Sequence, residues 1–105
     1  MTKPSIAIAA ALLLSSAAAA QDNATIIEAG HNLALEHCAD CHVVSDLDGP
    51  PDIDGVPTFR AVAADPAVTA SALKAFLATP HVEMPNLMLS DQESDDIVAY
   101  IMSLK

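Results

Sequence analysis

Apolar residues are spaced as in amphipathic helices in two segments, one near each end of the chain. Residues 24–42 form the first segment, in which isoleucine, leucine and alanine side chains have roughly helical spacing. In the second, Ser90 and Glu93 have the spacing of a capping box, which predicts a C-terminal helix from there to about residue 104. One face of that helix carries its predicted core residues: Ile97, Val98, Tyr100, Ile101 and Leu104.

The middle of the chain predicts loops and short helices. Residues 45–58 hold two glycines and three prolines, which break any regular pattern and predict a loop. A short helix is expected within residues 58–64. Another, capped by Thr69 or Ser71, must end before Pro80, because the residue before a proline disfavours helix. Since no segment shows the alternation of a β-strand, the pattern predicts an all-α domain.

Residues 1–20 are predicted to be a secretory signal peptide. Lys3 precedes an apolar run, and the segment ends in small residues at Ala20, as in a leader that is cleaved on export. A membrane anchor is the alternative, but a spanning helix needs about 20 strongly apolar residues, and this run is shorter. We therefore expect one exported mature domain, residues 21–105, without a transmembrane segment.

The chain is strongly acidic, with a formal net charge of -10 and 14 acidic side chains. Cleavage after Ala20 would remove Lys3 and no acidic residue, and so make the charge more negative still. A protein of this charge lacks the basic face that neutralises phosphate, so nucleic acid is excluded as a partner. A partner protein with a basic docking face is the expectation that this charge favours. The alternative is that most of these carboxylates only keep an exported protein soluble.

The composition provides little bulky material for a hydrophobic core. The chain has one tyrosine, two phenylalanines and no tryptophan, and a domain of this size buries only a modest part of its surface. Small exported domains usually add several disulfides or a metal, yet the two cysteines lie too close in sequence to close a useful loop. A large apolar cofactor such as haem would make up this deficit.

The two cysteines, Cys38 and Cys41, are separated by two residues, and His42 follows directly. Dithiol redox switches, half-sites for zinc and covalent haem attachment all use such a pair. Zinc is disfavoured because Cys41 and His42 cannot easily face one tetrahedral ion, and the only other histidines are His31, His37 and His81. The dithiol switch needs a βαβ context that the pattern lacks. Haem attachment is favoured, with two thioether anchors and the histidine on the iron.

Nearly the whole of residues 21–105 resembles the class I cytochromes c, in particular the small periplasmic monohaem proteins of bacteria. The stretches "AGHNLALEHCADCH", "MPNLMLS" and "DIVAYIMSL" carry the resemblance. It implies a cytochrome c fold of roughly three to five helices around one covalent haem c, with the N- and C-terminal helices crossing at Gly30 and Tyr100. Ala34 departs from mitochondrial relatives, which commonly have an aromatic residue there, so a crossing with less side-chain bulk is expected.

The resemblance also implies the second axial ligand. Met84 lies in "HVEMPN", which is similar to the family's ligand loop, whereas Met88 is close to the predicted cap of the last helix and Met102 lies within that helix. Met84 is therefore the expected ligand opposite His42, with Met88 as the alternative.

A hydrogen-bond partner for the axial histidine follows from the same resemblance. Pro50, or failing that Pro51, matches the family proline whose carbonyl accepts the Nδ1 proton of the ring, a bond that fixes the tautomer. Arg60, the sole arginine of the chain, is either the partner of a haem propionate or a solvated surface residue.

The function that this resemblance implies is electron transfer. The protein would carry one electron at a time between a redox protein donor and an acceptor, as a monomer and not as an enzyme. Two alternatives stay open. The haem could belong to a subunit of a dehydrogenase or oxidase complex, or it could bind small ligands or act on peroxide, which needs an open or easily vacated sixth position on the iron.

Overall fold

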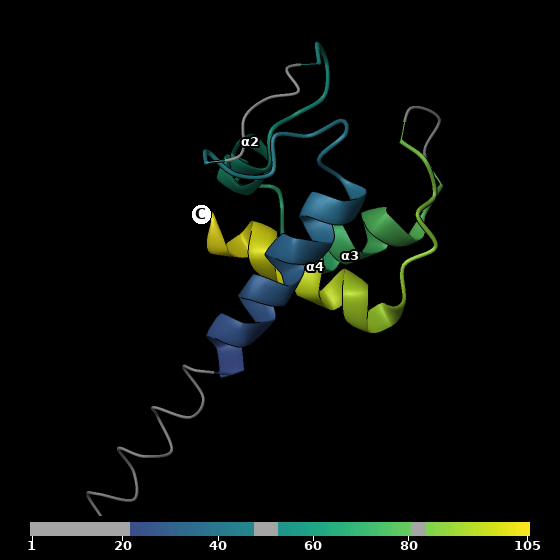
Figure 1. The fold of residues 1–105 in the computed structure, drawn as a ribbon. Helices are drawn as coiled ribbons and strands as arrows, with labels where there is room; N and C mark the ends of the chain where they lie inside the picture. The colour runs from purple at the N-terminus through teal and green to yellow at the C-terminus, as the bar shows by residue number, and fades with distance from the viewer. Residues whose placement is uncertain (1–21, 48–52, 81–83) are drawn as a thin grey trace, which may run out of the picture.

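The computed structural model describes residues 22–47, 53–80 and 84–105, and within these ranges the chain is helical, with no strand (Figure 1). This confirms the all-α prediction. The expected signal peptide lies outside the described residues and stays a prediction. In the described part of the chain, no helix has the length and apolarity that crossing a membrane requires.

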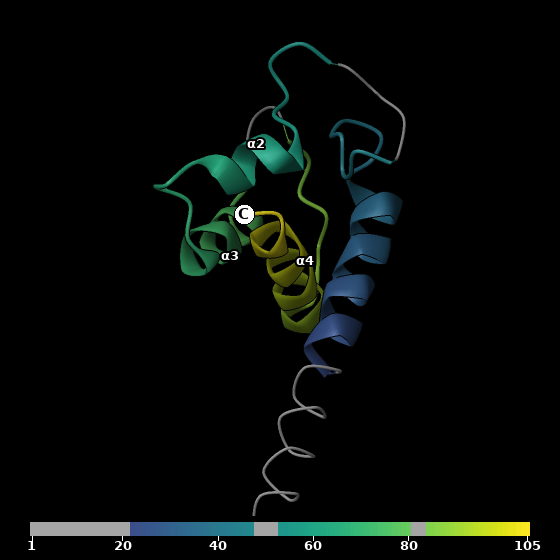
Figure 2. The same ribbon diagram turned by 90° about the vertical axis from the view of Figure 1, so that its left-hand side faces the viewer.

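The described helices follow the predicted order. The first, called the N-terminal helix below, includes residues 22–37. It is followed by α2 (Phe59–Ala64), α3 (Ala70–Ala78) and α4 (Asp91–Ser103). Both α2 and α3 contact α4, and Figure 2 shows α4 lying between these two helices and the N-terminal helix. The C-terminal helix is thus the centre of the packing.

The N-terminal helix ends earlier than the sequence pattern predicts. At its C-terminal end, the backbone N–H of Cys38 donates to the carbonyl of Ala34, four residues earlier, at 2.8 Å. The carbonyl of Cys38 then accepts from two N–H groups, those of Cys41 at 3.1 Å and His42 at 2.8 Å. Because one carbonyl accepts both bonds, the chain closes into a turn at this point, and the cysteine motif lies in that turn.

Side-chain caps set the starts of the other helices, as the sequence predicts. Thr58 Oγ1 accepts from the backbone N–H of Ala61 at the start of α2. At the start of α3 the cap is Thr69, which was predicted as an alternative to Ser71. Ser90 forms the predicted capping box of α4 with Glu93. Each cap satisfies an N–H group that has no partner within its helix.

The N-terminal helix crosses α4 in direct backbone contact. A Cβ atom placed on Gly30 would overlap the carbonyl oxygen of Asp96 and would lie 2.9 Å from the Cβ of Tyr100. One turn further along, Ala34 is completely buried. The predicted crossing of the two helices at Gly30 and Tyr100 is therefore confirmed. Ala34 adds only a small side chain to this crossing, as expected. The ring of His31 stacks on Tyr100 with 4.7 Å between centroids.

The core formed by the described residues is small. On α4 the predicted core positions are buried except for Leu104, which is half-buried at the end of the helix. Of the side chains that are fully buried, the largest are Ile97 and Val44. The remaining buried apolar residues come from all four helices and the turn: Ala34, Cys38, Phe59, Ala63, Leu73, Val98, Tyr100 and Ile101. This agrees with the expectation that a further apolar group completes the domain.

Gly30→Ala should destabilise the protein by about 3 kcal/mol or more, although alanine is the better helix former by about 1 kcal/mol. The added methyl group would meet the backbone of Asp96, which cannot rotate away as a side chain can. Denaturant unfolding of the haem-loaded protein measures the effect. Asn32→Ala, at an exposed position of the same helix, is the control and should change the stability by less than about 0.5 kcal/mol. Equal stability of wild type and Gly30→Ala would contradict the backbone contact.

The capping box of α4 predicts a pH-dependent contribution to stability. Glu93 Oε2 accepts from the backbone N–H of Ser90 at 2.8 Å; this bond, helped by the Ser90 hydroxyl and the charge of His37, lowers the pKa of Glu93. A carboxylate with a lowered pKa stabilises the fold above its ordinary pKa, and this stabilisation is lost as the pH falls through the lowered value.

Glu93→Gln keeps a capping acceptor but removes the charge. We expect the thermal midpoint of the variant to lie below that of wild type at neutral pH, and the difference to shrink to zero as the pH falls below the lowered pKa of Glu93. Melting curves of both proteins across this pH range measure the effect. A difference that persists unchanged in acid would show that the charge of Glu93 has no role in the cap.

Candidate haem site

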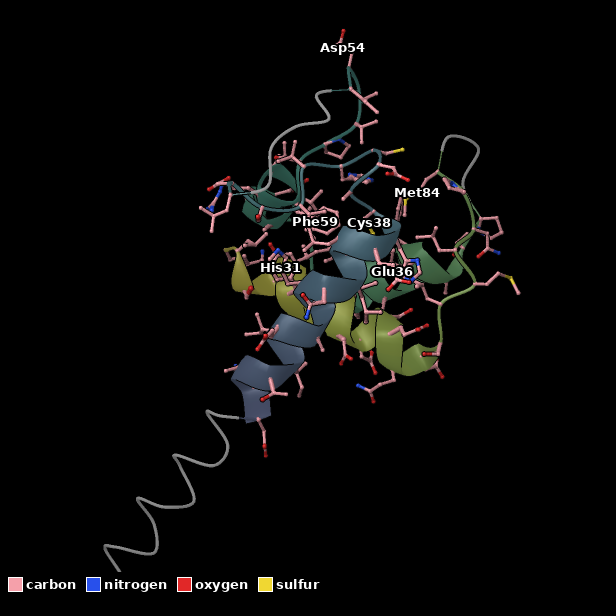
Figure 3. The ribbon with its side chains drawn as sticks, viewed as in Figure 1. His31, Glu36, Cys38, Asp54, Phe59 and Met84 are labelled. Carbon is pink, nitrogen blue, oxygen red and sulfur yellow. The ribbon has the colours of Figure 1, made fainter. Side chains whose placement is uncertain are left out.

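The turn after the N-terminal helix presents its two sulfur atoms to different surroundings. Cys38 is buried, with 5% of its surface exposed, whereas Cys41 is exposed. Figure 3 shows Cys38 at the end of the N-terminal helix. A group bonded to both sulfur atoms would therefore have one edge against the core and another near solvent.

The protonation of Cys38 argues against a dithiol redox switch. Burial, with a smaller contribution from the nearby Cys41, raises the pKa of Cys38 to about 11. Reactive redox cysteines have a lowered pKa, because the thiolate is the nucleophile. Within the described ranges, no group of three or more histidine, cysteine or acidic side chains is placed to hold a metal ion.

The ring of His42 is oriented by a hydrogen bond to the loop before α2. Its Nδ1 atom lies 2.7 Å from the carbonyl oxygen of Pro57. Because a carbonyl oxygen only accepts, Nδ1 must carry the proton, and Nε2 then has the free lone pair. This is the tautomer in which a histidine binds a metal through Nε2, and the bond to the carbonyl increases the basicity of the ring. The donor set of the turn, two thiols and such a histidine, fits covalent haem.

The proline that accepts this proton is one that the sequence analysis missed. Pro50 and Pro51, the residues named there, lie outside the described residues. The role given to Pro50 is filled by Pro57. One signal in the sequence could have found it: Pro57 directly precedes Thr58, the N-cap of α2. A residue in that position is held by a helix, whereas Pro50 lies in the middle of the predicted loop.

Further contacts hold residues 42–44 against the start of α2. The Phe59 N–H donates to the carbonyl of Val43 at 3.0 Å, and the Phe59 ring lies 5.4 Å from the ring of His42. From α4, the Tyr100 hydroxyl donates to the carbonyl of Val44 at 2.8 Å. The short segment that carries His42 is thus hydrogen-bonded to two other elements.

Met84 and Met88 differ sharply in exposure. Met84 is half-buried and lines a shallow depression that also includes Phe76 and Leu77 of α3. Met88 is 85% exposed and has a left-handed backbone, with φ 54; its N–H donates to the side chain of Asn86 at 3.1 Å. A sulfur atom turned to solvent is poorly placed to reach a buried ligand site.

The extended segment that starts at Met84 lies near the cysteine turn. Figures 1 and 2 both place residues 84–90 beside the end of the N-terminal helix that carries Cys38. In the view of Figure 3, Met84 and Phe59 lie on opposite sides of Cys38. The Phe59 ring in turn contacts His42.

Arg60 is paired within the protein. Its guanidinium forms an exposed ion pair with Asp46, at 2.6 Å between Nη2 and Oδ2, and the hydrogen bond to that carboxylate raises the pKa of Arg60. An exposed pair of this kind contributes little to stability. Of the two roles considered for Arg60, the structure favours the surface residue. His81 lies outside the described residues.

Comparison with known proteins agrees with this geometry. The model of the cytochrome c family matches residues 27–105. A curated relative, cytochrome c-552 of Bradyrhizobium diazoefficiens, is 40% identical over 95 residues, which cover 89% of this chain and 90% of the relative. No solved structure gives a significant match.

Replacing both Cys38 and Cys41 by alanine should yield a chain that lacks haem and is largely unfolded, because the described core is small and a cofactor that binds only the native state stabilises it. Circular dichroism and a thermal scan of the purified variant measure the loss of helix. Cys41→Ala alone, which keeps the buried anchor, is the control and should retain haem and helix. A haem-free double variant that melts cooperatively would show that the polypeptide core suffices.

Proposed function

Since the chain belongs to the cytochrome c family, which binds haem c covalently, we propose that it carries one electron at a time in the periplasm. In this proposal Cys38 and Cys41 form the two thioether bonds. His42 and Met84 are the axial ligands of the iron. The observation that carries the proposal is the hydrogen bond from His42 Nδ1 to the carbonyl of Pro57, because it leaves Nε2 free to bind a metal.

The bound haem supplies the redox chemistry, since its iron takes up and releases a single electron. The residues of the chain hold that group and adjust its potential. Pro57 keeps His42 in one tautomer and makes it a stronger donor. The thioether of Met84 would be a further ligand of the iron and would raise the reduction potential. With the same two ligands in both oxidation states, little has to rearrange when the electron moves.

The choice of Met84 as the second ligand rests on exposure and backbone conformation. Met84 is half-buried in a segment that lies beside the cysteine turn (Figures 1 and 2). Met88 would have to swing from an exposed, left-handed conformation into the interior. With Met84 bound, no position on the iron is open to small molecules. This favours a carrier over a ligand-binding or peroxide-consuming protein.

The proposed location and partners are argued from the sequence. Residues 1–20 have the character of a secretory signal peptide, and the remaining residues 21–105 would form the exported domain. The formal net charge of -10 favours redox partners with basic docking faces, for which association slows as salt is added. We propose that the carrier is a monomer that exchanges electrons with such partners by transient contact.

Met84→Ala should remove a ligand of the iron, whereas Met88→Ala should leave the iron ligands unchanged. Loss of Met84 should abolish the weak far-red absorption of the iron–thioether bond, lower the reduction potential and let carbon monoxide bind the reduced protein rapidly. Met88→Ala is the matched control: all three properties should stay as in wild type, and the stability should change by less than about 0.5 kcal/mol because the side chain is exposed. Optical spectra and redox titration of the purified proteins measure these effects.

Two other outcomes would change the assignment. If Met88→Ala opened the iron and Met84→Ala did not, the exposed conformation of Met88 would have to rearrange on haem binding. If wild type itself bound carbon monoxide rapidly at neutral pH, the sixth position would be open and the carrier proposal would fail.

A further inference from the structure

Tyr100 combines two roles that a single packing residue does not need. Its Cβ lies at the helix crossing next to Gly30, and its ring stacks on His31. At the far end of the same side chain, the hydroxyl donates a buried hydrogen bond of 2.8 Å to the carbonyl of Val44, a residue 56 positions away in sequence. Packing at the helix crossing requires only the ring of Tyr100. The role of the hydroxyl must therefore be sought in its hydrogen bond to Val44.

The acceptor of this bond lies two residues after His42. Val44 is 1% exposed, so water cannot easily replace the tyrosine as a partner for its carbonyl. In the same short segment, His42 donates to Pro57 at 2.7 Å and Val43 accepts from Phe59 at 3.0 Å. The segment 42–44 is therefore hydrogen-bonded both to residues at the start of α2 and to α4.

We propose that the Tyr100 hydroxyl is a positioning group for the axial histidine: it fixes the segment 42–44 so that the His42 ring keeps its hydrogen bond to Pro57. This inference rests on the proposed ligation of iron by His42. Tyr100 also touches Phe59, with 6.4 Å between ring centroids, and Phe59 in turn contacts the His42 ring at 5.4 Å. Packing and hydrogen bonding thus act on the same segment.

The proposal predicts a direction for the reduction potential. A hydrogen bond from Nδ1 to a carbonyl makes the imidazole a stronger donor and so favours the oxidised iron. If the segment loosens, the bond to Pro57 weakens and the potential should rise. A residue that only packs at the crossing would change the stability and leave both the potential and the histidine ring unaffected.

Tyr100→Phe separates these two cases, because it keeps the ring at the crossing and removes only the hydroxyl. In the haem-loaded, reduced protein, NMR of the His42 ring reports the exchange of its Nδ1 proton with solvent. We expect this exchange to become about tenfold faster, the factor that corresponds to the loss of one hydrogen bond of ordinary strength, and the potential to rise. Ile97→Val is the matched control: it trims a fully buried side chain on the same helix and should alter neither property.

A second measurement strengthens the hydrogen bond from Tyr100 to Val44 instead of removing it. Tyr100 is the only tyrosine in the chain, so growth on 3-fluorotyrosine changes this one phenol into a stronger donor. The proposal expects slower exchange of the His42 Nδ1 proton and a lower potential in the fluorinated protein. If Tyr100→Phe fails to fold, this replacement alone decides the question, because it leaves the shape of the side chain nearly unchanged.

The possible outcomes are distinct. Opposite shifts in the two proteins, with none in Ile97→Val, would support the positioning role. Exchange and potential that match wild type in both proteins would overturn it and leave Tyr100 as a packing residue, with the ligation by His42 intact. If the His42 ring of wild type lacked the ring-current shifts of an iron-bound imidazole, the proposed ligation would fail, and the positioning role with it.

Discussion

The contact between the N-terminal helix and α4 is the constraint on which the rest of the structure depends. Gly30 lies against the backbone of Asp96 with no room for a side chain, so the two helices pack closer than side chains would normally allow. This contact fixes the direction of the N-terminal helix relative to α4. It therefore also fixes where the turn that follows the helix places Cys38 and His42. It also places Tyr100 between the crossing and the segment that follows the histidine.

From the crossing, aromatic rings lead toward the proposed ligand. Tyr100 contacts Phe59, and Phe59 contacts His42. Tyr100 and Phe59 supply much of the bulk in a core that otherwise consists of small and medium apolar side chains. Each of these two rings both fills space in the core and contacts the segment that carries His42: Phe59 contacts the His42 ring, and the Tyr100 hydroxyl donates to Val44.

The candidate site draws on parts of the chain that are far apart in sequence. In the proposed site, the cysteine turn would supply the anchors and the segment before α4 would supply Met84. The loop before α2 supplies the carbonyl of Pro57. Each part is tied to a helix end: the turn ends the N-terminal helix, Thr58 caps α2 and Ser90 caps α4. The residues of the candidate site thus lie in turns and loops next to helix ends and not within the helices themselves.

The sequence by itself determined the all-α fold, the capping box at Ser90, the crossing at Gly30 and the cysteine motif. Each of these depends on residues that are close in sequence or on a pattern shared with a family. Only the tertiary structure decided that Pro57 is the acceptor for His42, that Met88 faces solvent and that Tyr100 reaches Val44. These depend on how segments that are far apart in sequence pack together, and several prolines or methionines in one loop are equivalent until that packing brings one of them into contact.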